Sequence, residues 1–224
     1  MCGRFSFVVE KKKVQKVLPH VTIKSDLAIS YNIAPTQSAY VLTNTEPNIV
    51  QKMSWGLIPH WAKDDKNAVS NINARIETLA EKPSFQKPIR SQRCIILADS
   101  FYEWKTEGKN KIPYRILLKE GELLLLAGIW DEWRGKKTFS IITTQPNAEM
   151  SVLHNRMPVI LSHGVQGADW TTWLGETDLD TLLYMCKKPK DDFLKMYRVS
   201  EKVNSVRNDS ADLHIERLPD LTLF

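Results

Sequence analysis

The chain has 224 residues, of which 42% are hydrophobic and 25% charged, a balance that is typical of globular proteins and excludes disordered and fibrous classes. Its formal net charge of +5 permits a nucleic-acid partner without requiring one. Three cysteines and no apolar signal segment argue against a disulfide framework and favour a cytoplasmic protein. The longest apolar run, at 123–130, is too short to span a membrane. No zinc spacing, P-loop or dinucleotide fingerprint occurs, so we expect no metal and no cofactor.

Short apolar segments bounded by turn residues predict a protein built mainly of strands. In chain order, we expect strands at 5–9, 38–44, 48–58, 137–144, 158–162 and 193–200. The apolar run at 93–104 predicts a buried strand that leaves toward a loop. The segment 112–130 predicts a hairpin, because two apolar runs flank a short turn in which Gly121 can adopt positive φ.

Three segments predict short helices. The first, at 10–19, ends at Pro19, and the other two, at 165–175 and 178–188, are amphipathic with an aspartate near their starts. Many strands and short turns favour an α+β fold built on a mostly antiparallel, barrel-like twisted sheet with peripheral helices. We expect a single domain over 1–224 with its motif-bearing core at about 2–210, followed by a tail that packs as a final strand or stays loose.

The chain begins MCGRF, which places Cys2 directly behind the initiator Met1. Aminopeptidases remove an initiator methionine when the second residue is small, and cysteine qualifies. Removal would leave Cys2 with a free α-amine next to its thiol, a 1,2-aminothiol with chemistry that an internal cysteine lacks. The alternative is that Cys2 is simply a small apolar residue at the start of a strand.

Polar residues beside aromatic pairs and expected strand ends form five further motifs. These are YNIAPTQ with Asn32 and Pro35, WGLIPHW with Trp55, Pro59 and Trp61, NINARIET with Asn73, Arg75 and Glu77, ADSFYEWK with Glu103, and LHNRMPVIL with His154 and Arg156. A sixth stretch, VNSVRNDS, carries Arg207. Taken one at a time, each has a purely structural interpretation, such as a turn cap for Asn73, a structural histidine for His154 and core packing for the tryptophans.

The order and spacing of MCGRF, YNIAPTQ, WGLIPHW, NARIET, FYEW and HNRMPV resemble those of the SRAP family, the SOS-response-associated peptidases or abasic-site-processing proteins. The resemblance implies recognition of abasic sites in single-stranded DNA and a covalent cross-link through Cys2 after removal of Met1. An α-amine, with a pKa of about 7.7–8.0, is partly neutral at cellular pH and can attack the aldehyde of an open abasic sugar. The thiol then closes a thiazolidine ring, which removes the imine and protects the strand from elimination.

The resemblance implies roles for three catalytic residues besides Cys2. Glu103 would be an acid/base that opens the sugar or moves protons during imine formation, and His154 a second proton carrier. Asn73 would hold the sugar or the amine of Cys2. A DNA-binding surface is also implied, which comprises Arg4, Asn32, Pro35, Trp55, Pro59, Trp61, Arg75, Arg156 and Arg207. Its arginines would grip phosphates, and its tryptophans would stack on or wedge against bases.

Two alternatives remain open. In the first, Cys2, His154 and Glu103 form the nucleophile, base and orienting group of an autopeptidase or thiol hydrolase. In the second, the protein binds single strands without chemistry, which would make Cys2 dispensable. For the preferred function we expect a monomer in the cytoplasm, associated with the nucleoid in a bacterium, with abasic single-stranded DNA as its partner, no membrane contact and weak lyase activity.

Overall fold

Strands make up most of the regular structure of the computed structural model, which describes residues 2–24, 26–66, 68–162, 169–187 and 189–218. The strands are β1 (Arg4–Phe7), β2 (Ser30–Ile33), β3 (Ser38–Thr43), β4 (Glu46–Trp55), β5 (Asn73–Arg75), β6 (Arg93–Ala98), β7 (Ser100–Glu107), β8 (Asn110–Leu118), β9 (Leu124–Trp133), β10 (Lys136–Thr144), β11 (Met157–Pro158), β12 (Ile160–Leu161) and β13 (Leu194–Arg198). The predicted α+β class, with mostly antiparallel strands and short helices, is confirmed.

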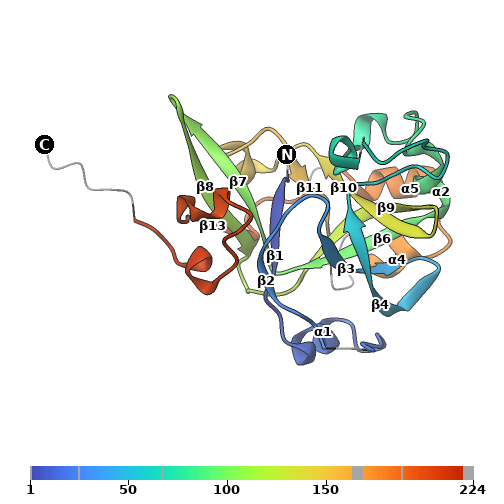
Figure 1. The fold of residues 1–224 in the computed structure, drawn as a ribbon, viewed down its shortest axis with the longest axis horizontal. Coiled ribbons are helices and arrows are strands. Elements are labelled where there is room, and N and C mark those ends of the chain that lie inside the picture. Colours follow the sequence, from blue (N-terminus) through green and yellow to red (C-terminus); the bar gives the residue numbers. More distant parts are fainter. Residues whose placement is uncertain (1, 25, 67, 163–168, 188, 219–224) are drawn as a thin grey trace, which may run out of the picture.

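The strands form a closed barrel and a second sheet beside it (Figure 1). The barrel follows the order β10-β4-β3-β6-β9 and closes by pairing of β9 with β10. Three short strands add to it: β5 and β11 pair with β10, and β12 pairs with β9. The second sheet is antiparallel and has the order β13-β8-β7-β1-β2. Closure leaves the barrel strands without a free edge, which is one way in which proteins avoid edge-to-edge aggregation.

Aromatic side chains in the core join the two sheets. The ring of Phe5, on β1, lies 4.9 Å from that of Trp55 at the end of β4, in an edge-to-face arrangement. Trp55 in turn stacks on Phe139 of β10 with ring centres 6.4 Å apart. All three side chains are fully buried. Because aromatic groups of this size contribute most of the apolar area of a core, this contact fixes β1 against the barrel.

Helices are short and lie around the sheets, as expected. They are α1 (Lys11–Val17), α2 (Gln86–Ser91), α3 (Ala148–Ser151), α4 (Trp170–Leu174) and α5 (Leu179–Met185), with 3-10 turns η1 (Ala68–Asn71), η2 (Ile76–Thr78), η3 (Glu201–Asn204) and η4 (Ala211–His214). The carboxylates of Asp169 and Asp178 accept backbone hydrogen bonds at the starts of α4 and α5, which confirms the aspartate signals. Residues 165–168 of the predicted helix at 165–175, and residue 188 of the predicted helix at 178–188, lie outside the described residues. No helix of the described residues is long and apolar enough to cross a membrane.

The predicted hairpin at 112–130 is wrong. Strands β8 and β9 do follow each other around a turn with Gly121 at φ +64°, but they do not pair. β8 pairs with β7 and β13 in the second sheet, whereas β9 pairs with β6, β10 and β12 in the barrel. The reason is burial, since the run Leu124–Asp131 is buried on both faces and β8 is largely half-exposed.

Two other segments differ from their predictions. The run at 93–104 is not one strand that enters a loop but two strands, β6 in the barrel and β7 in the second sheet, so Glu103 lies inside a paired strand. The segment 158–162 divides because β11 pairs with β10 and β12 with β9. After Ser210 the chain forms η4 and no strand up to residue 218, the last that is described.

Candidate active site and nucleic-acid interface

Cys2 lies just before β1, in a position fixed by two neighbouring strands. The side-chain amide of Asn73, on β5, donates a hydrogen bond of 2.8 Å to the backbone carbonyl of Cys2. On the other side β1 pairs with β7, and Arg4 lies opposite Tyr102. Continued by one residue, this antiparallel register places Gly3 opposite Glu103. Figure 1 shows the start of β1 between β7 and β8 on one side and β10 and β11 on the other.

The Cys2 thiol is fully buried and protonated in this state. Burial raises the pKa of the thiol well above its ordinary value, and the negative charge of Glu103 raises it further. The sulfur makes one weak contact, of 3.8 Å, to the carbonyl of Arg4. Glu103 is itself 3% exposed, so its carboxylate acts on Cys2 in an environment with little water to screen it.

Asn73 and Arg75 lie on β5, which pairs in parallel with β10. Strand alternation sends their side chains to the same face. Asn73 is buried, and its carbonyl oxygen Oδ1 has no hydrogen-bond partner among the described residues. Arg75 is exposed. One strand therefore presents a buried amide beside Cys2 and, two residues later, a cation at the surface.

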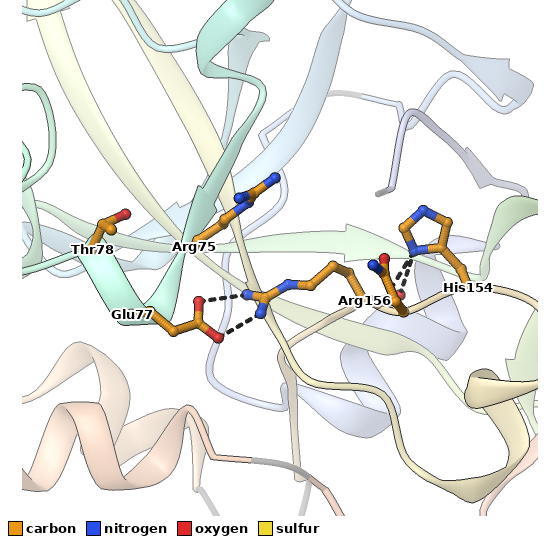
Figure 2. Close-up of a pocket in the computed structure, with 6 residues that line it drawn as sticks. Arg75, Glu77, Thr78, His154 and Arg156 are labelled. Carbon is orange, nitrogen blue, oxygen red and sulfur yellow. Dashed lines mark hydrogen bonds and ion pairs between the residues drawn. The ribbon is translucent and has the colours of Figure 1, made fainter.

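His154 follows α3 and lies in a cleft of about 420 Å³ (Figure 2). The cleft is lined by Arg75, Glu77, Thr78, His154, Asn155 and Arg156. His154 Nδ1 lies 3.0 Å from the backbone nitrogen of Arg156 and 3.3 Å from the Arg156 carbonyl oxygen, so it accepts from the N–H or donates to the carbonyl according to the tautomer of the ring. In Figure 2 the side chains of Arg75 and His154 point to the same side of the cleft, away from Glu77.

Arg156 lies across this cleft and forms a bidentate ion pair with Glu77. Its Nη1 is 2.5 Å from Glu77 Oε1 and its Nη2 is 3.0 Å from Glu77 Oε2. Nη2 also donates to the backbone carbonyl of Thr143 at 2.6 Å. No three His, Cys, Asp or Glu side chains of the described residues gather into a group that could hold a metal ion.

Comparisons with known proteins identify the family of this chain. The family model described as SOS response associated peptidase (SRAP) matches residues 1–206. The chain belongs to the SRAP family. It is 42% identical over 228 residues to "Abasic site processing protein YoqW" of Bacillus subtilis, with 95% of this chain and 98% of that protein covered. It is 31% identical to "Abasic site processing protein HMCES" of Gallus gallus, over 82% of this chain and 65% of that protein.

The SRAP fold is also found in a solved structure. An X-ray crystal structure of a protein from Bacteroides thetaiotaomicron aligns with a TM-score of 0.84 and 27% sequence identity. The alignment covers 97% of this chain and all of that protein.

Arg4 and Asn32, two residues expected at the DNA surface of an SRAP protein, form an internal clamp. Arg4 Nη1 donates to Asn32 Oδ1 and to the carbonyl of Val203, both at 2.8 Å. Asn32 Nδ2 donates to the carbonyls of Ser205 at 3.0 Å and Asn208 at 2.7 Å. Burial lowers the pKa of Arg4. This clamp connects β1, which begins two residues after Cys2, to residues 203–208.

The remaining expected DNA contacts divide into buried and exposed groups. Trp55 is 0% exposed and its indole N–H donates to the carbonyl of Ile72, so its ring faces the core and no base reaches it in this conformation. Pro59 is buried and Pro35 is half-buried. Trp61, by contrast, is 58% exposed, and Arg207 is exposed within the segment that Asn32 holds.

Sequence reasoning missed part of this site. Thr78 and Asn155 line the cleft, and the carbonyl of Thr143 holds Arg156. A backbone carbonyl and two common polar residues leave no recognisable signal in a sequence. Glu77 stands inside the NARIET motif, but its ionic partner lies 79 residues further along the chain, so the pairing is visible only in the fold.

Proposed function

We propose that this protein processes abasic sites in single-stranded DNA by covalent capture through Cys2. The observation that carries the proposal is the hydrogen bond from Asn73 to the Cys2 carbonyl, which holds the start of β1 beside Glu103. Membership of the SRAP family and the names of its relatives, abasic site processing proteins, support the same function. The proposal requires removal of Met1, which lies outside the described residues.

The chemistry proceeds in three balanced steps. The neutral α-amine of Cys2 attacks the aldehyde carbon of the open sugar and forms a C–N bond. The resulting carbinolamine loses water to give an imine. The thiol then forms a C–S bond to the imine carbon while its proton ends on nitrogen, so the closed thiazolidine equals protein plus DNA minus one water. A thiol that is protonated at rest, as at Cys2, brings this proton with it.

Glu103 and His154 are proposed as the proton carriers. Glu103, beside the thiol, would accept a proton from Cys2 as the sulfur adds to carbon and return it to the nitrogen. His154 would take the proton of the sugar's C1 hydroxyl and return it to the ring oxygen, so the sugar opens to the aldehyde and the imidazole ends as it began. An imine that does not close can lose the 3′ phosphate by elimination, which would give weak lyase activity. The exposed Arg75 and Arg207 would contact phosphates of the strand.

The test is denaturing electrophoresis and intact mass of the protein mixed with a single-stranded oligonucleotide that contains one abasic site. Wild type without Met1, Cys2→Ala and Cys2→Ser are compared side by side. We expect a band that resists denaturation only with wild type, with a mass of protein plus DNA minus water. Absence of this adduct from wild type that lacks Met1 would overturn the proposal.

A second candidate, autopeptidase activity, would use the same residues. The position of Glu103 beside Cys2 favours it, because a carboxylate next to a thiol can serve as the base that activates a nucleophile. Cleavage of the Met1–Cys2 bond would be its reaction. Protein made by translation without aminopeptidase separates the cases, since only an autopeptidase loses Met1 under those conditions.

We also propose that the protein is located in the cytoplasm and acts as a monomer.

A further inference from the structure

The guanidinium of Arg156 has two kinds of partner in the cleft. On one side Nη2 donates to the backbone carbonyl of Thr143 in β10. On the other side Nη1 and Nη2 together bind the carboxylate of Glu77. Figure 2 shows Glu77 reaching toward the end of Arg156 from the turn that follows Arg75. The donors that face the cleft are therefore already bound to an anion in the DNA-free protein.

The two partners differ in how easily they can leave. Thr143 is fully buried in the barrel and cannot move without breaking strand pairing. The side chain of Glu77, in contrast, is 47% exposed and lies on η2, a turn of three residues. Arg156 is 12% exposed at its side chain. The inner contact thus holds the arginine in place, and the outer contact can exchange.

A phosphate of a DNA strand offers the same pair of oxygens as a carboxylate. The planar fork of arginine binds either anion through two parallel hydrogen bonds. Ion pairs with an exposed partner contribute about 0–1 kcal/mol, so exchange of Glu77 for a phosphate costs little. The hydrogen bond from Arg156 holds the pKa of Glu77 below its ordinary value, so the carboxylate stays charged at neutral pH.

We propose that Glu77 occupies the phosphate position of Arg156 when no DNA is bound and acts as an intramolecular competitor of the strand. A DNA strand that enters the cleft displaces Glu77, and one of its phosphates binds the guanidinium of Arg156 in place of the carboxylate, next to Arg75. Because Glu77 must be displaced by every strand, it lowers the affinity for undamaged single strands by a constant factor. The inference deepens the proposed function and rests on it.

The experiment measures binding of a fluorescent, undamaged single-stranded oligonucleotide at low ionic strength, with fluorescence anisotropy. We expect Glu77→Gln to tighten binding about two- to fivefold, the factor that corresponds to loss of an exposed ion pair. Glu81→Gln is the matched control, because Glu81 is exposed on the same segment and does not hydrogen-bond to Arg156. It removes the same charge and should have a smaller effect.

Two further variants separate competition from general electrostatics. Glu77→Asp keeps the charge but shortens the side chain, so it should also tighten binding if the fork contact matters. In an Arg156→Gln background, Glu77→Gln should have no more effect than Glu81→Gln, because the competitor has lost its target and only its charge remains to be removed. Tightening in this background that exceeds that of Glu81→Gln, or tightening in the wild-type background that only equals it, would overturn the inference. Weaker binding by Glu77→Gln would also overturn it and would make Glu77 a support for Arg156.

The result is distinguishable from failure of the proposed function. Wild type that forms the adduct with abasic DNA but shows no change with Glu77→Gln contradicts only the competitor role. Wild type that binds no single-stranded DNA contradicts both. Thermal unfolding of each variant verifies that the changes in binding come from folded protein.

Discussion

Asn73 and Cys2 are 71 residues apart in the chain and are joined by a single buried hydrogen bond from side-chain amide to backbone carbonyl. The bond comes from a strand at the edge of the barrel, and its acceptor belongs to the residue that carries the proposed nucleophile. It orients Cys2 through the backbone carbonyl and does not involve the thiol or the main-chain nitrogen.

Asn73→Ala should slow cross-linking to abasic DNA at least about tenfold. A buried carbonyl that loses its donor costs about 1–3 kcal/mol, and misplacement of Cys2 raises the barrier by a similar amount. The measurement is the single-turnover rate of adduct formation on a denaturing gel. Asn71→Ala is the matched control, because Asn71 is also buried and donates to a backbone carbonyl, that of Leu57, at 3.1 Å. Equal rates for the two variants would contradict a positioning role.

Asn32→Ala should loosen residues 203–208 and lower the free energy of unfolding by about 2–3 kcal/mol, because several partly buried hydrogen bonds lose a partner at once. Hydrogen exchange should rise within this segment before other regions. Asn204→Ala is a suitable comparison, since its bond to the indole of Trp104 is at the surface and should contribute about 1 kcal/mol or less. Unchanged exchange in Asn32→Ala would show that the clamp is dispensable.

The two tryptophans of WGLIPHW should respond differently to alanine. Trp55→Ala removes a buried ring between Phe5 and Phe139 and should lower the free energy of unfolding by about 3–5 kcal/mol. Trp61→Ala should leave stability within about 0.5 kcal/mol and weaken binding of single-stranded DNA, since the exposed ring is available for stacking. Urea unfolding and fluorescence anisotropy measure the two effects. Full DNA affinity in Trp61→Ala would exclude a stacking role.

Stability should fall at high pH because of buried thiols. Burial raises the pKa of Cys2, Cys94 and Cys186, to about 12 for Cys186, from an ordinary value of 9.0. Above pH 9.0 the unfolded chain therefore releases thiol protons that the folded protein keeps, and the free energy of unfolding decreases by about 1.4 kcal/mol per pH unit for each thiol. Below that pH the stabilisation is complete.

A cysteine variant tests this origin. Cys94→Ala should reduce the slope of unfolding free energy against pH by about one thiol's contribution, whatever it does to stability at neutral pH. Urea unfolding at a series of pH values between about 8 and 11 measures the slope. Parallel curves for wild type and Cys94→Ala would show that ionisation of this thiol does not contribute.

Much of the local structure follows from the sequence by itself. Runs of apolar and β-branched residues predicted most of the strands, and aspartates predicted the starts of α4 and α5, because these signals act between neighbours in the chain. The motifs also identified the family, since they depend on residue type and order alone. Of the four residues at which chemistry was expected, Cys2, Asn73 and Glu103 are neighbours in the fold, whereas His154 lies in the cleft lined by Arg75 and Arg156.

Long-range pairing was decided only by the tertiary structure. The glycine between β8 and β9 allows the chain to turn, but it does not decide whether the two strands pair. Pairing depends on which sheet can bury each strand, and β9 has both faces buried in the barrel. Likewise Asn32 and Arg4 are polar residues of the kind usually found at a surface. In the fold, Arg4 donates a hydrogen bond to Asn32, and Asn32 donates to the backbone of the segment 203–208. The Arg156–Glu77 pair arises in the same way, because a charge finds its partner through space and not along the sequence.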